Sequence, residues 1–279
     1  VTLPEHPEAA MAAPATQPDI LGGDWLARTI PLAAEGDDEP LATLVHRSTP
    51  PRRKAAVLYV HGYCDYFFQV HLAERWEALG FDFYALDLRR YGRSLRPGQM
   101  PNFCADLAVY EEELDAAADI LRNEMGHKRL VVMAHSTGGL VTALWADRRR
   151  GRGLVDAMVM NSPWFELAGS WLLRGPVTAA IDIVGAIAPS VVVSGLGPHY
   201  GRSIHRSGVG EWDYRLDWKP IEGFPVRAGW FRAIRRGHAR LAAGLTIDAP
   251  VLVCCSTASG PNDRWHDAIM RTDSVLDVE

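Results

Sequence analysis

Residues 134–139, Ala-His-Ser-Thr-Gly-Gly, have the residue types and spacing of a nucleophilic serine site. They follow an apolar run and open a helical stretch, residues 137–150. A sharp turn from strand to helix strains the backbone of its central serine and needs small residues two positions before and after it. Ala134 and Gly138 meet this need. We therefore predict that Ser136 is a catalytic nucleophile.

The helix that starts beside Ser136 would supply the rest of the chemistry. Its first amide groups and its positive dipole end lie where an oxyanion would form during acyl transfer. His135 is the histidine nearest to Ser136 in the sequence. Because neighbours on a tight turn point in different directions, we interpret His135 as a packing residue and not as the general base.

A second motif, His61-Gly62-Tyr63, ends the apolar run 55–60. With the serine motif, it resembles the α/β-hydrolase superfamily, and within it the monoacylglycerol-lipase and lysophospholipase-like (serine aminopeptidase-type) branch. The resemblance implies an oxyanion hole formed by the backbone amides of Tyr63 and Thr137. It leaves His61 as a structural turn residue.

A third motif, Asp87-Leu88-Arg89-Arg90-Tyr91-Gly92-Arg93-Ser94, resembles the Asp-x-Arg-Gly-x-Gly-x-Ser loop of the same family. Arg90 replaces the first glycine of that loop, whose role is mainly structural. The three motifs occur in the family order, and the resemblance extends from about Thr29 to Glu279. It implies neither a metal ion nor an organic cofactor.

The catalytic acid of this family follows the strand expected at residues 250–255. Asp273 occupies that position, in the tail Asp-Ser-Val-Leu-Asp-Val-Glu. The excursion 256–272 before it is longer than in the family. Asp263, Asp267 and Asp277 therefore stay open as alternatives.

The catalytic histidine follows the acid in this fold, but no histidine follows Asp273 here. We expect a chain truncated at its C-terminus, without its last strand, its histidine and its closing helix. Val1 in place of a methionine fits this expectation. The alternatives are that His266 substitutes as the base, or that the chain is a non-catalytic binding module.

Short apolar runs alternate with helical stretches along the chain, which predicts an α/β fold with a mostly parallel sheet flanked by helices. Residues 164–224 break this rhythm, and we interpret them as a helical cap insertion. Residues 19–163 and 225–279 form the core, and residues 1–18 a flexible arm. The expected strands are 41–45, 55–60, 81–88, 130–134, 155–160 and 250–255, and the expected helices are 65–79, 107–125, 137–150 and 226–245.

Charge and cysteine content narrow the function further. Lys and Arg total 29 against 34 Asp and Glu, so a net charge of -5 gives no support to a nucleic-acid partner. The four cysteines have no metal-ligand or disulfide spacing, and we expect Cys254 and Cys255 to be buried in a cytoplasmic protein. Residues 177–193 are apolar, but they contain Asp182 and are too short to span a membrane.

The function expected from these features is hydrolysis of a carboxylic ester through an acyl-enzyme on Ser136. Trp164, Trp171 and Trp212 of the cap favour an acyl chain or another apolar, lipid-like group in a small-molecule substrate. The resemblance implies a lipase or a lysophospholipase. A peptidase or an acyltransferase of this fold would share the same residues. Dehalogenases and epoxide hydrolases carry aspartate at the elbow, so Ser136 argues against both.

Overall fold

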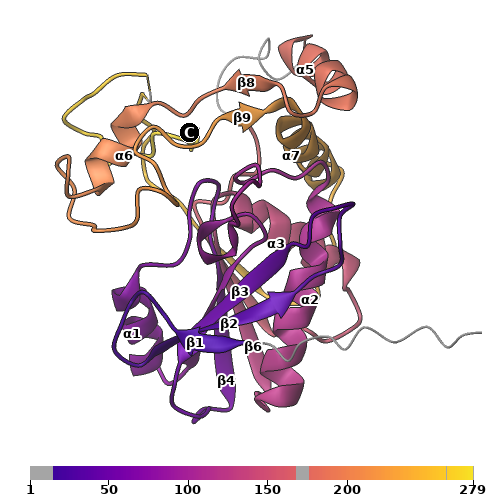
Figure 1. The fold of residues 1–279 in the computed structure, drawn as a ribbon, viewed down its shortest axis with the longest axis vertical. Coiled ribbons are helices and arrows are strands. Elements are labelled where there is room, and N and C mark those ends of the chain that lie inside the picture. Colours follow the sequence, from indigo (N-terminus) through magenta and orange to yellow (C-terminus); the bar gives the residue numbers. More distant parts are fainter. Residues whose placement is uncertain (1–14, 168–175, 262, 279) are drawn as a thin grey trace, which may run out of the picture.

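The computed structural model describes residues 15–167, 176–261 and 263–278 (Figure 1). An eight-stranded sheet forms the centre, with strand order β1-β2-β3-β5-β4-β6-β7-β10. Strands β5, β4, β6, β7 and β10 are parallel, whereas β1, β2 and β3 pair antiparallel at one edge. The strands are β1 (Thr16–Pro18), β2 (Trp25–Pro31), β3 (Leu41–Arg47), β4 (Ala55–Val60), β5 (Asp82–Asp87), β6 (Arg129–His135), β7 (Ala157–Asn161) and β10 (Val251–Cys254).

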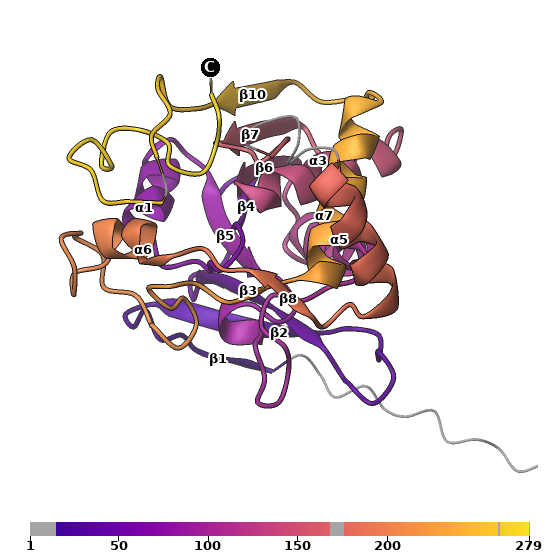
Figure 2. The same cartoon turned by 90° about the horizontal axis from the view of Figure 1, so that it is seen from above.

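Helices cover both faces of this sheet, as Figure 2 shows from above. One face packs on α2 (Glu111–Asp119), α3 (Thr137–Arg148) and α7 (Ala228–Ala242), and the other packs on α1 (Val70–Ala78). Side chains alternate between the two cores, because successive residues of a strand point to opposite faces. In β4, Leu58 lies in the first core and Val57 in the second. The predicted α/β-hydrolase fold class is confirmed.

The remaining elements lie above the carboxyl ends of the parallel strands (Figure 1). They are α5 (Pro176–Ile187), β8 (Val192–Ser194), α6 (Pro198–Ile204) and β9 (Val226–Arg227). Strands β8 and β9 form a separate two-stranded sheet. The sequence predicted no strand within the expected insertion 164–224, and β8 escaped notice because three residues are too few to show a period. Of the expected arm 1–18, the structure describes residues 15–18, and Thr16–Pro18 forms β1.

Most predicted elements lie close to their expected positions, and two differ in an informative way. Helix α1 begins at Val70 and not at residue 65, because Asp65 and Tyr66 bind Lys219 and Arg215 instead of forming a first turn. The expected helix 107–125 is a composite of a 3₁₀ turn (Leu107–Tyr110), α2 and a π-helix (Ile120–Glu124). A 3₁₀ turn (Gly92–Ser94) also follows β5.

Strand β10 lies at the edge of the sheet, and all its residues are exposed. The prediction that Cys254 and Cys255 are buried is therefore wrong. An apolar run indicates a strand, but it does not say whether another element covers that strand.

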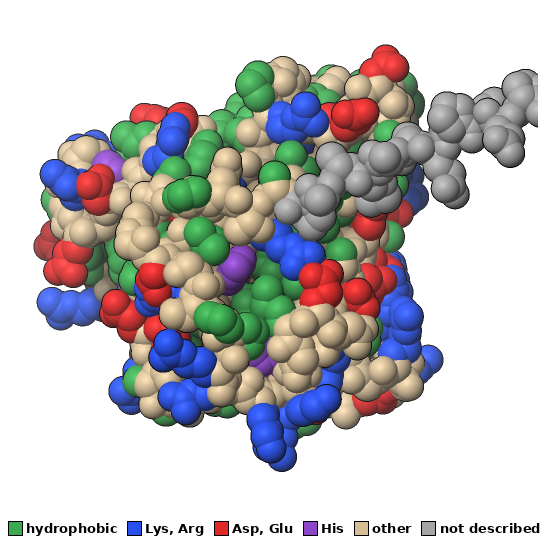
Figure 3. All heavy atoms as spheres, turned by 60° about the horizontal axis from the view of Figure 1, so that its bottom comes forward, with side chains coloured by type: hydrophobic (Ala, Val, Ile, Leu, Met, Phe, Trp, Pro, Cys, Tyr) green, Lys and Arg blue, Asp and Glu red, His purple; other side chains and the backbone are tan. Residues whose placement is uncertain are grey.

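On the face shown in Figure 3, acidic and basic side chains are intermixed.

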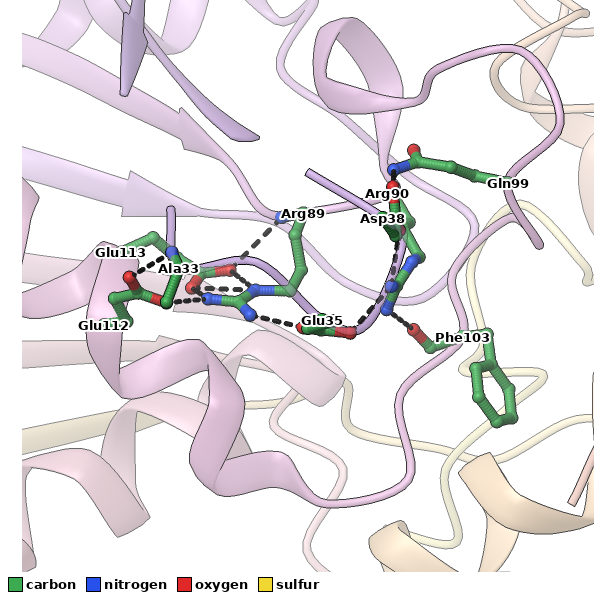
Figure 4. Close-up of polar contacts among 9 residues, drawn as sticks. All are labelled: Ala33, Glu35, Asp38, Arg89, Arg90, Gln99, Phe103, Glu112 and Glu113. Atoms are coloured by element: carbon green, nitrogen blue, oxygen red, sulfur yellow. Dashed lines mark hydrogen bonds and ion pairs between the residues drawn. The ribbon is translucent and has the colours of Figure 1, made fainter. Parts of the chain in front are cut away.

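The loop after β5 is fixed by a network of ion pairs (Figure 4). Arg89 binds the carboxylate of Glu113 on α2 at 2.6 Å and that of Glu35 at 2.5 Å. Arg90 binds Glu35 and Asp38, both at 2.7 Å. The φ angle of Arg90 is 64°, in the left-handed region that favours glycine. The glycine that the family has at this position would suit this backbone conformation. In this chain the ion pairs of Arg90 offset the strain of its positive φ.

Candidate active site

Ser136 occupies the turn between β6 and α3, with φ 53° and ψ −122°. This conformation is costly for a residue other than glycine and persists only where neighbouring structure enforces it. Two backbone hydrogen bonds do so. The Ser136 amide donates to the carbonyl of Asn161 at 3.2 Å, and its carbonyl accepts from the amide of Trp164 at 3.0 Å. The end of β7 and the segment after it thus hold the elbow in place.

Glycines let the turn after β4 contact the elbow directly. A Cβ atom on Gly138 would lie 2.3 Å from the carbonyl oxygen of His61. A Cβ atom on Gly62 would lie 2.9 Å from the Cβ atom of Ser136. Both distances are too short for real atoms, so these positions tolerate no side chain. The sequence predicted this constraint for Gly138, but not for Gly62.

This contact brings together the two amides predicted to form an oxyanion hole. Tyr63 directly follows Gly62, and Thr137 directly follows Ser136 at the start of α3. Within the described ranges, neither amide donates to a protein acceptor. Both are therefore available to a negatively charged oxygen at the elbow, where the dipole of α3 adds a favourable field.

His61 acts inside the protein and not on a substrate. The side chain is 1% exposed. Its Nε2 atom accepts a hydrogen bond from the Leu88 amide at 3.1 Å, so Nδ1 carries the proton and donates to the Gly62 carbonyl at 2.8 Å. The ring also lies 4.8 Å from that of Tyr91. Both ring nitrogens are thus used to fix the turn that carries the Tyr63 amide.

The side chain of His135 hydrogen bonds to the end of β7 and lines a cavity. Its Nδ1–H group donates a hydrogen bond to the carbonyl oxygen of Asn161 at 3.0 Å. The side chain lines a cavity of about 280 Å³ shared with Asp65, Tyr200 and Lys219. Burial lowers the pKa of His135 below its ordinary value of 6.5, although the charge of Asp65 opposes this effect. His135 is therefore neutral at pH 7.

Asp273 lies in the loop after β10. Its Oδ1 atom accepts hydrogen bonds from the amides of Val275 and Leu276, at 2.8 and 2.7 Å. Its charge raises the pKa of both His135 and Tyr200, opposing burial in the first case and adding to it in the second. The carboxylate thus acts on two residues that line the same cavity, whereas Asp263, Asp267 and Asp277 are exposed side chains of the same loop.

His266 is turned into its own loop. Its Nε2 atom is buried and has no hydrogen-bond partner among the described residues. The ring packs against Gly260, whose Cβ would lie 3.1 Å from Nε2. In the described part of the chain, no hydrogen bond joins His266 to Ser136 or Asp273.

Aromatic rings form a wall beside the elbow. Tyr63 and Trp230 have ring centroids 4.1 Å apart, and Trp164 stacks on Trp230 at 6.0 Å. The sequence singled out Trp164, but it missed Trp230, whose helical position gave no sign that it faces the site. Trp212 lies elsewhere, against His71. Trp171 is outside the described residues.

The described residues contain no group of three or more His, Cys, Asp or Glu side chains that could hold a metal ion. Over the same ranges, no helix combines the length and the apolar character needed to cross a bilayer. The chemistry that this arrangement supports is nucleophilic attack by Ser136 with charge stabilisation by backbone amides.

Residues 51–260 match the family model described as serine aminopeptidase, S33. The chain belongs to this family. Over 150 residues it is 30% identical to the monoacylglycerol lipase of Mycolicibacterium smegmatis, a match that covers 53% of this chain and 50% of that protein. The chain thus matches about half the length of this curated relative.

Two solved lipase structures share the fold. A soluble variant of monoglyceride lipase from Saccharomyces cerevisiae, in complex with a substrate analog, superposes with a TM-score of 0.61 at 18% identity. The superposition covers 82% of this chain and 77% of the Saccharomyces cerevisiae protein. The monoacylglycerol lipase of Paleococcus ferrophilus gives a TM-score of 0.59 at 20% identity, over 80% of this chain and 79% of that one. Both likenesses support the α/β-hydrolase fold.

Proposed function

We propose that this protein is a serine hydrolase that cleaves a carboxylic ester through an acyl-enzyme on Ser136. The observation that carries the proposal is the strained serine in direct contact with the turn of Gly62, with two free amides beside it. Strained backbone of this kind is kept where it serves function. Membership of the S33 family supports the same chemistry.

In this proposal the Ser136 hydroxyl oxygen attacks the ester carbonyl carbon. The amides of Tyr63 and Thr137 donate to the resulting oxyanion, and the alcohol leaves with the proton that the general base took from the serine. Water, activated by the same base, then attacks the acyl-enzyme and frees the acid. Asp273 holds the base in position.

We propose that His266 is not the base, because the base histidine follows the acid in the order of catalytic residues of this fold and His266 precedes Asp273. The placement of His266 favours this assignment, because its ring packs against Gly260 and its buried Nε2 atom has no hydrogen-bond partner among the described residues. Replacing His266 with glutamine tests it: the full-length protein is expected to keep its turnover. Loss of turnover in the folded variant would make His266 the base.

The substrate we propose is a lipid-like ester such as a monoacylglycerol or a lysophospholipid. Tyr63 and Trp164, which are partly exposed and backed by the buried ring of Trp230, would give an acyl chain an apolar surface beside the nucleophile. The similarity to monoacylglycerol lipases supports this class. We also propose that residues 164–224 form the cap over this site, and that the protein acts in the cytoplasm.

A peptidase is the second candidate, because the matching family is described as serine aminopeptidase. Initial rates of the full-length protein on a monoacylglycerol, a lysophospholipid and an aminoacyl p-nitroanilide separate the two. We expect the esters to be cleaved faster, and Ser136→Ala to reduce kcat by on the order of 10⁶-fold. Preference for the anilide would contradict the esterase proposal, and activity that survives in Ser136→Ala would contradict the nucleophile.

A further inference from the structure

Three of the four residues that start at Tyr63 hydrogen bond to the segment 215–225, which precedes β9. The Tyr63 hydroxyl donates to the Pro225 carbonyl at 3.0 Å. The Lys219 ammonium donates to the Asp65 carboxylate at 2.8 Å. The Tyr66 hydroxyl accepts from the Arg215 amide at 2.7 Å. Between them lies Cys64, whose side chain is buried. Hydrogen bonds and an ion pair thus join the turn that carries the Tyr63 amide to the segment 215–225.

The ion pair of Asp65 and Lys219 is the charged centre of this contact. The two side chains are only 5% and 7% exposed. Aromatic rings surround the ammonium group, since Phe68, Tyr200 and Tyr214 have their centroids within 5.8 Å of it. Burial alone would lower the pKa of Lys219, but the charge of Asp65 raises it above the ordinary value. Lys219 therefore keeps its charge, and water screens this buried pair poorly.

A buried pair is sensitive to geometry in a way that an exposed pair is not. Separating two ionised groups in a low-dielectric site costs several kcal/mol, so each holds the other at a fixed distance. The pair of Arg206 and Asp213 offers a contrast within the same part of the chain. Its side chains are 65% and 66% exposed, and such pairs contribute little.

The connection from Asp65 to the oxyanion hole is short and stiff. Only Cys64 separates Asp65 from Tyr63, and Cys64 has a φ of 50°, in the left-handed region. A residue other than glycine stays there only when its neighbours hold it. A displacement of Asp65 would therefore change the direction of the Tyr63 amide. Lys219 acts on that amide across the cap interface.

We propose that Asp65 and Lys219 are positioning residues, which hold the Tyr63 amide in oxyanion-binding geometry only while the segment 215–225 is docked. The catalytic consequence rests on the proposed function, whereas the coupling between the cap and the turn does not. An oxyanion donor acts mainly in the transition state, so loss of the pair lowers kcat and leaves KM nearly unchanged.

Lys219→Met in the full-length protein tests this coupling, with Arg206→Met as the matched control. We expect amide hydrogen exchange of residues 61–67 to increase on the order of 10-fold, while exchange in β6 and α3 stays as in the wild type. We expect kcat on an ester to fall on the order of 100-fold, with KM changed less than about 2-fold. Arg206→Met is expected to change none of these values.

Asp65→Asn keeps the test decisive if Lys219→Met does not fold, because it removes the charge with little change in shape. It is expected to shift exchange and kcat in the same direction. Unchanged exchange of residues 61–67 in the folded variants would overturn the proposal, and so would an effect on KM in place of kcat. Failure of the proposed function has a different signature: the wild type itself shows no turnover that depends on Ser136.

Discussion

At the residue scale, the site depends on positions where no side chain fits. Gly138 faces the carbonyls of Val60 and His61, whereas Gly195 has open space around its Cα. The end of β4 can approach the elbow only because Gly138 places no Cβ atom between the two backbones. Catalytic geometry and folding stability are therefore linked at the same glycine.

Gly138→Ala is expected to destabilise the protein and misplace the oxyanion turn. The added Cβ would lie 2.3 Å from a backbone oxygen that cannot move without shifting β4. Overpacking of this kind costs about 1–3 kcal/mol, which urea unfolding would measure. Gly195→Ala, the control, is expected to stay within about 0.5 kcal/mol of the wild type. Equal stability of the two variants would contradict the close contact.

At the element scale, Arg89 joins the end of β5 to α2. It is 3% exposed and its partner Glu113 is fully buried. Burial raises the pKa of Glu113 above its ordinary value of 4.5, although Arg89 opposes this. The residue thus needs its arginine to stay ionised at neutral pH.

Arg89→Met is expected to cost about 3–5 kcal/mol at pH 8, because it leaves an unpaired carboxylate in the core. Without Arg89 the pKa of Glu113 rises further, so the folded state binds more protons than the unfolded state and stability falls as pH rises. The deficit should therefore shrink between pH 8 and pH 5.5, as urea midpoints would show. The exposed pair of Arg206 and Asp213 is the control, and Arg206→Met should cost less than about 1 kcal/mol. A deficit that does not depend on pH would contradict this account.

Elements with strong periodicity were predictable, whereas contacts between elements were not. The strand 55–60 has its predicted limits as β4, and the helix after Ser136 starts at the predicted residue, because local sequence decides both. The start of α1 was misplaced, since Asp65 pairs with a lysine 154 residues away. The contacts of Trp230 with Tyr63 and of Gly62 with Ser136 were not predicted, because they too join segments that are distant in the sequence. Their roles depend on which segments meet at the elbow.

At the scale of the whole molecule, buried histidines tie stability to pH. Burial lowers the pKa of His46, His135 and His238 below 6.5. Below that pH the unfolded chain binds protons that the folded protein does not, so stability is full at higher pH and is lost as the pH falls. Urea midpoints should therefore decrease from pH 7.5 to pH 5.5. His238→Gln should reduce the decrease, and a midpoint that rises on acidification would contradict this assignment.

The most direct test of the account is to locate the adduct of a fluorophosphonate probe on the full-length protein by peptide mass spectrometry. Ser162 is a suitable control, because it also has a positive φ, of 46°, and lies at the end of the neighbouring strand β7. The account predicts an adduct on Ser136 that disappears in Ser136→Ala and persists in Ser162→Ala. An adduct on another residue, or none on the folded protein, would contradict the claim that Ser136 is an activated nucleophile.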